Sequence, residues 1–247
     1  MHNKAARPLV NLVAGGLLFV CAAGPANAET FKLTSLDWPP YSGEALDEGG
    51  LSVKVARAAF EAAGHSMEVV FLPWQRAVAT GLGEGYVGYF PEYCSPELAE
   101  EKCAFSAKMG SGPLGFVEST SAPVEWTTLD DLAGLEIGTV SGYVNTPEFD
   151  ARAADGRLSV QPANDDLTNV RKVAAGRLDI AVIDSNVLRW LVEQNPDLEG
   201  QVQMNGTLLA DKELFVCFQK SPAGDAAREA FNAGLGQIDV PALMSGN

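Results

Sequence analysis

Strand-like and helix-like segments alternate along almost the whole chain, and this alternation restricts the fold more than any other feature. Residues 31–36, 67–72 and 86–90 have the pattern of strands, and residues 51–62 and 73–82 between them place apolar side chains at helical spacing. An order of strand, helix, strand, helix, strand predicts a parallel sheet flanked by helices.

A second unit of the same kind begins near residue 129, and it needs a sheet and a core of its own. The glycine-rich but apolar segment 110–117 leads into it, and we expect that segment to be a crossing strand rather than a flexible linker. The second unit has expected strands at 135–140, 158–161 and 178–183 and expected helices at 144–154, 165–175 and 185–194.

A last strand and helix, at 213–218 and 223–235, follow the second unit. They have no room in a completed second sheet, so we expect them to return to the first. The sequence therefore predicts an α/β protein of two lobes joined by two hinge strands. The first lobe is expected to comprise residues 29–112 plus 208–247, and the second lobe residues 113–207.

The N-terminus has the three parts of an export signal. Lys4 and Arg7 precede an apolar run, and Ala26-Asn27-Ala28 supplies a small-x-small cleavage site. The run is about fifteen residues, shorter than the roughly twenty that a membrane span needs. We expect a signal peptide over residues 1–28, cleavage after Ala28, and a periplasmic protein without membrane insertion. Cys21 leaves a lipoprotein anchor as the alternative.

The charge of the chain excludes some partners. Removing the leader takes away two of the 17 basic residues and none of the 32 acidic ones, which leaves a mature net charge of −17. Such a surface repels nucleic-acid phosphates and anionic lipids. The mature chain contains one histidine, His65, so we expect no metal site, and we also expect no cofactor.

Three cysteines remain after cleavage. Cys94 and Cys103 are close in sequence, and in an oxidising compartment we expect them to form a disulfide across a short loop. Cys217 lies in the apolar run 214–218 and is expected to be an inert core thiol.

Four motifs follow strands or open helices in a characteristic order. They are Asp37-Trp38-Pro39-Pro40-Tyr41, Pro73-Trp74-Gln75-Arg76-Ala77, residues 138–142 and residues 176–184. In these motifs and their order the chain resembles family 3 of the bacterial extracellular solute-binding proteins, the polar amino-acid type. The resemblance implies a type II-like periplasmic binding protein fold, closure of two lobes on a small solute, a monomer, and delivery to an inner-membrane ABC permease.

Ligands of open α/β sheets bind beyond the carboxyl ends of strands, so side chains there are the candidates for a ligand site. In the first lobe, Trp38 and Tyr41 could stack on a ligand or cover the sheet edge, and Arg76 could grip a carboxylate, close an interlobe salt bridge or be structural. Glu92 would favour a cationic group or be ordinary solvated surface. The candidates in the first lobe are Asp37, Trp38, Tyr41, Trp74, Arg76, Phe90 and Glu92.

In the second lobe, the segment Ser141-Gly142-Tyr143-Val144-Asn145 lies between an expected strand and helix. Free backbone N–H groups and the helix dipole there attract anions such as a carboxylate, so Ser141, Gly142, Tyr143 and Asn145 are candidates. Asp184 could hold an amino group, as the resemblance implies, or cap the next helix.

The chain departs from the family in one place. Amino-acid binders of the family usually have an arginine for the ligand carboxylate between the third strand and a Phe-Ser element, and residues 93–106 contain none. Two alternatives to transport therefore stay open: a sensor or oxidoreductase-accessory role, and a lyase that would use Glu92 and Asp184. The sequence shows no recognisable set of catalytic residues, so we expect a binding protein rather than an enzyme. We also expect a gap between Trp74 and Tyr143, because the two lobes must leave space for a ligand.

Overall fold

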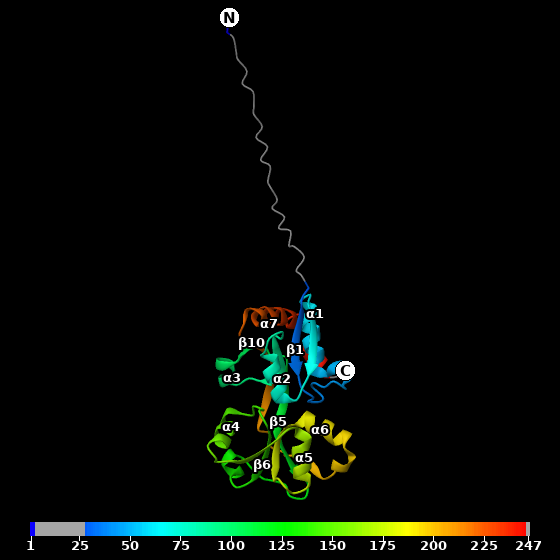
Figure 1. Cartoon of the computed structure of the whole chain (residues 1–247), viewed down its shortest axis with the longest axis vertical. Coiled ribbons are helices and arrows are strands. Elements are labelled where there is room, and N and C mark those ends of the chain that lie inside the picture. Colours follow the sequence, from blue (N-terminus) through cyan, green and yellow to red (C-terminus); the bar gives the residue numbers. More distant parts are fainter. Residues whose placement is uncertain (3–27, 246–247) are drawn as a thin grey trace.

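The structure, a computed structural model, describes residues 1–2 and 28–245, and two lobes are joined by a pair of strands (Figure 1). The expected export signal lies almost entirely outside the described residues. Within the described residues, none of the helices combines the length and apolar character needed to cross a bilayer.

The first lobe is the upper one in Figure 1. Its strand β1 (Thr30–Ser35) pairs in parallel with β2 (Ser66–Phe71) on one side and with β3 (Gly88–Tyr93) on the other. Helix α1 packs against α7, and the rings of Phe60, Phe218 and Phe231 meet in the core between them. The helices are α1 (Leu51–Ala62), α2 (Trp74–Gly81), α3 (Pro96–Glu101), α7 (Pro222–Leu235) and α8 (Val240–Met244).

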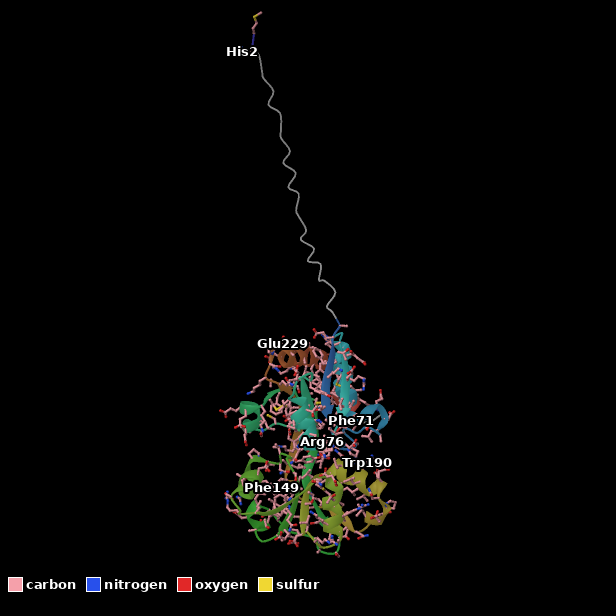
Figure 2. The ribbon with its side chains drawn as sticks, in the orientation of Figure 1. His2, Phe71, Arg76, Phe149, Trp190 and Glu229 are labelled. Carbon is pink, nitrogen blue, oxygen red and sulfur yellow. A yellow bond between two sulfur atoms is a disulfide. The ribbon has the colours of Figure 1, made fainter. Side chains whose placement is uncertain are left out.

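The second lobe repeats this plan with its own core. Strand β6 (Glu136–Val140) pairs in parallel with β7 (Ser159–Ala163) and with β8 (Ile180–Asp184). Phe116 packs against Phe149 and Trp126 inside this lobe, where Figure 2 labels Phe149. Helices α4 (Pro147–Ala154), α5 (Asp166–Ala174) and α6 (Ser185–Gln194) belong to it.

Two long antiparallel strands join the lobes. Strand β5 (Gly110–Ser119) pairs with β8 of the second lobe, and β10 (Ala210–Gln219) pairs with β3 of the first. Because β5 and β10 also pair with each other, one sheet runs through both lobes in the order β2-β1-β3-β10-β5-β8-β6-β7. The predicted return of the last strand to the first sheet is seen in this pairing, and the division at 112/113 and 207/208 stays a prediction. The short strands β4 (Cys103–Phe105) and β9 (Val202–Met204) flank β10 and β5.

The predicted disulfide is wrong. Cys103 is bonded to Cys217, and Cys94 is a free, exposed thiol. Strand β4 begins at Cys103 and pairs with β10, which carries Cys217, so the two Cα atoms lie 4.9 Å apart. Helix α3 fills the segment between Cys94 and Cys103 and leaves Cys94 at the surface. The expectation of an inert thiol at Cys217 is wrong for the same reason.

Candidate functional site

The lobes meet at the carboxyl ends of their strands. The loop after β1 carries Trp38, and Glu92 lies near the end of β3. Tyr143 follows β6, and Asp184 ends β8. Trp38, Glu92 and Tyr143 line a small cavity of about 20 Å³ between the lobes, and Asp184 lies outside its lining. Its walls are formed by Leu36, Trp38, Trp74, Pro91, Glu92, Tyr93, Tyr143, Val144 and Leu214.

Tyr41 ties the first lobe to the second. Its hydroxyl donates to the carboxylate of Asp184 at 3.1 Å and 3.2 Å and accepts from the Asn186 side-chain amide at 2.8 Å. Asp184 also accepts a hydrogen bond from the Asn186 backbone N–H at 2.8 Å and so caps α6. Helix capping was one of the two roles predicted for Asp184. The same carboxylate therefore caps a helix and holds the other lobe.

Trp74 makes a second connection between the lobes. Its indole N–H donates to the carbonyl oxygen of Gly142 at 2.8 Å, and its ring meets the ring of Tyr143 edge to face at 5.6 Å between centroids. The gap expected between Trp74 and Tyr143 is therefore absent in this closed arrangement. A positive φ of 82° at Gly142 turns the chain where it approaches Trp74.

Aromatic rings fill the boundary between the lobes. Trp38 stacks on Tyr41 at 4.6 Å between centroids and contacts the edges of Tyr93 at 5.9 Å and Tyr143 at 6.5 Å. Trp38, Tyr41 and Tyr93 are buried. Their rings therefore form the shared wall of both lobes rather than a cover for one sheet edge.

Glu92 is a carboxylate in an almost dry environment. Its residue is 5% exposed, and it accepts hydrogen bonds from the Tyr89 hydroxyl at 3.0 Å and the Tyr93 backbone N–H at 2.8 Å. Burial raises the pKa of Glu92 to about 7, and these two hydrogen bonds and the charge of Lys212 oppose that change.

Two further buried carboxyls lie in the second lobe. Burial raises the pKa of Asp184 to about 6, against its hydrogen bonds from the start of α6. Burial raises the pKa of Asp166 to about 7, and the nearby charges of Asp165 and Asp184 add to this effect. The nearby side chain of Trp38 acts in the opposite direction and lowers the pKa of Asp166.

Three of the five backbone N–H groups in the predicted anion site at 141–145 are in use. The backbone N–H groups of Ser141 and Tyr143 donate to carbonyl oxygens of their own lobe, at 2.8 Å and 3.1 Å. The backbone N–H and side-chain amide of Asn145 both donate to the carboxylate of Asp150, at 2.9 Å and 2.8 Å. Helix α4 begins at Pro147, three residues beyond its predicted start. An internal carboxylate therefore occupies the place predicted for a ligand anion.

No family model and no curated protein matches the chain, but solved structures do. A histidine kinase sensor domain with similarity to periplasmic binding proteins is 19% identical, with 88% of this chain and 95% of that chain covered and a TM-score of 0.74. An arginine-specific periplasmic binding protein from Salmonella typhimurium is 15% identical over 89% of this chain and 99% of its own, with a TM-score of 0.69. The ligand-binding core of GluR0 from Nostoc punctiforme, in complex with L-glutamate, is 16% identical over 87% and 96%, with a TM-score of 0.68.

The chain has a periplasmic binding protein fold. The predicted fold class, with two lobes of type II-like architecture, is confirmed by these matches together with the two crossing strands.

Of the twelve predicted site residues, Trp38, Trp74, Glu92 and Tyr143 line the central cavity of this periplasmic binding protein fold, and the other eight do not. Arg76 is exposed on α2, and Figure 2 shows it on the first lobe close to the boundary. Asp37 is also exposed, and its carboxylate accepts the backbone N–H of Glu44 at 2.9 Å. Phe90 is fully buried in the first-lobe core.

Sequence reasoning missed four residues at the boundary: Tyr93, Asp166, Asn186 and Lys212. Asp166 and Asn186 each stand in the first turn of a helix that follows a strand, a position at which a ligand site could have been suspected. No sequence pattern indicated Lys212 as a site residue, because only the pairing of β10 with β5 and β3 brings it beside the ring of Tyr93.

Two open grooves lead from the surface to the same boundary. One, of about 880 Å³, runs between the loop after β1 and helices α5 and α6, and Trp38 and Tyr143 belong to its walls. The other, of about 460 Å³, lies on the side of α2 and includes Trp74 and Tyr143. Because these residues also line the central cavity, both grooves border the closed site.

Proposed function

We propose that this protein is an extracytoplasmic solute-binding protein of the polar amino-acid type. In this proposal residues 1–28 are removed on export, and the mature monomer captures one small solute between its lobes in the periplasm. An inner-membrane ABC permease then receives the solute. The protein binds and releases its ligand without chemical change.

One observation carries the proposal: side chains from both lobes line one cavity in a fold whose lobes are joined by two crossing strands. A water molecule needs roughly 10 to 15 Å³ of such space, so the cavity of about 20 Å³ admits little more than one water. A solute must therefore enter an open form, and bending at β5 and β10 is the motion that would separate the lobes.

Thermal unfolding with a solute panel tests the proposal. A ligand at a hundredfold excess over its Kd stabilises the folded protein by about 2.7 kcal/mol. Tryptophan fluorescence should change with the same solute, because Trp38 and Trp74 both lie at the boundary. Trp74→Ala should abolish the response, and the exposed-site control Glu193→Ala should retain it. A broad panel without any response would count against transport.

A second candidate is a sensor or accessory protein on the same fold. The direct contact of Trp74 with Tyr143 favours it, because the closed lobes need no solute to complete their interface. A histidine kinase sensor domain is among the structures that this chain resembles. Native mass spectrometry of protein from its own periplasm separates the candidates: a retained small mass indicates a solute carrier, and a retained protein partner indicates an accessory role.

A further inference from the structure

We propose that the cleft selects small organic cations that carry no carboxylate group. The inference rests on the proposed function and names the ligand class for the same site. The proposed ligand class differs from amino acids in one respect, the absence of the α-carboxylate.

The first argument is the set of carboxyl groups buried at the boundary. Glu92, Asp166 and Asp184 are 5%, 7% and 1% exposed, and two lobes contribute them. None of the ion pairs within the described residues includes any of these three carboxyls. A buried carboxylate without a cation is costly, and a cationic ligand would supply the missing partner.

The second argument is the aromatic wall. Trp38, Trp74, Tyr93 and Tyr143 all line the cavity. Aromatic faces attract ammonium and guanidinium groups, and the attraction grows when water is excluded. The wall already binds one cation at its border, because the Nζ of Lys212 lies 4.9 Å from the centroid of the Tyr93 ring.

The third argument is an unused polar atom. The hydroxyl of Tyr93 is buried and has no hydrogen-bond partner in the described part of the chain. Tyr93 is 7% exposed and lines the cavity next to Glu92. Its oxygen could accept from an N–H group of a cation that also faces Glu92.

The fourth argument is that, among the described residues, no lysine or arginine lines the central cavity. Asp150 takes the donors of Asn145 in the second lobe, and Arg76 is exposed outside the cavity wall. Lys212 donates to the carbonyl oxygen of Asn145, and the charges of Asp150 and Glu92 act on it. An amino acid would therefore bring its carboxylate among like charges.

Matched solute pairs test the inference directly. Agmatine is arginine without its carboxylate, and cadaverine is lysine without its carboxylate. Titration calorimetry on the full mature protein at pH 8 should give at least tenfold tighter binding for the decarboxylated member of a pair. Glu92→Gln should weaken that binding at least tenfold. The exposed-site control Asp197→Asn should leave it unchanged, and Asp184→Asn serves as the second variant if Glu92→Gln does not fold.

The remaining outcomes separate this inference from the proposed function. Binding of arginine or lysine that is equal to or tighter than that of the decarboxylated member overturns the inference. If Lys212→Met then abolishes this amino-acid binding, Lys212 is the cation that holds the ligand carboxylate. If only neutral or anionic solutes of a wider panel bind, the inference fails and the proposed function stands. If no solute of any charge binds, both fail.

Discussion

The hydroxyl of Tyr41 lies 3.1 Å from Oδ2 of Asp184 and forms a hydrogen bond from one lobe to the other. The Asn186 amide donates to the same hydroxyl at 2.8 Å, so three polar groups meet at one point of the boundary. Burial raises the pKa of the Tyr41 hydroxyl, which keeps it protonated as the donor to Asp184. The bond is therefore a defined element of the closed state that mutation can remove.

Tyr41→Phe should loosen the closed state. The change removes the donor to Asp184 and leaves the Asn186 amide without its acceptor, which should lower the free energy of unfolding by about 1 to 3 kcal/mol. Small-angle scattering should show a larger radius of gyration, and chemical denaturation should report the stability. Tyr86→Phe, at a half-buried tyrosine of the first lobe, is the matched control. Equal behaviour of the two variants would show that the Tyr41 bond does not hold the lobes.

The free energy of unfolding of the unliganded protein should fall as the pH rises from about 4.5 to 7. Burial raises the pKa of Glu92 and of Asp166 to about 7 and that of Asp184 to about 6, so the folded state keeps protons that the unfolded chain has released. At 1.36 kcal/mol for each pKa unit, ionising one such carboxyl costs the folded state about 3 kcal/mol. Denaturation curves at pH 5, 6, 7 and 8 measure the slope.

Glu92→Gln provides the control for that slope. The amide cannot ionise, so the variant should lose less stability than the wild type between pH 5 and pH 8. Glu193→Gln, at an exposed position, should keep the full slope. A wild-type stability that rises with pH across this window would contradict the assignment of buried, protonated carboxyls.

A cationic ligand should bind more tightly as the pH rises from 5.5 to 8. A bound cation favours the ionised forms of Glu92 and Asp184, so binding must displace protons from carboxyls whose pKa values lie near 7 and 6. Agmatine keeps its charge throughout this range and is a suitable probe. Calorimetry in two buffers of different ionisation enthalpy should detect proton release at pH 6. Uptake of protons, or an affinity independent of pH, would argue against contact between the cation and these carboxyls.

The sequence predicted the local features of this fold and missed those that depend on pairing between distant segments. Apolar periodicity and glycine positions were enough for the two-lobed plan and for most of its strands and helices, but not for α3, β4 and α8. The bond between Cys103 and Cys217 joins residues 114 positions apart, and nothing in their spacing indicates that β4 pairs with β10. Tyr41 and Asp184 were chosen separately as ligand residues, but only the closed lobes show that they contact each other.

The disulfide between Cys103 and Cys217 predicts that substitutions of Cys217 and Cys94 have different effects on stability, and that the cysteines differ in their reaction with alkylating reagents. Cys217→Ser should lower the free energy of unfolding by about 5 kcal/mol in the chain-entropy estimate, because the closed loop exceeds 100 residues. Cys94→Ser should change it by less than about 0.5 kcal/mol, because that thiol is exposed and free. Alkylation under denaturing, non-reducing conditions should label Cys94 alone in the mature chain. A disulfide-linked peptide containing Cys94 and Cys103 would refute this pairing.

Gly112→Ala should hold the lobes apart. Gly112 lies in β5 beneath the interlobe bond, and a Cβ atom there would overlap both the Asp184 carboxylate and the Tyr41 hydroxyl. The overlap is relieved if the lobes separate, so the radius of gyration should rise and the affinity for the ligand should fall at least tenfold. Gly206→Ala is the control, because a Cβ there meets no atom within 4 Å. If Gly112→Ala retains the closed radius and full affinity, the contact of Tyr41 with Asp184 is not required for closure, and binding must depend on the side of the boundary held by Trp74.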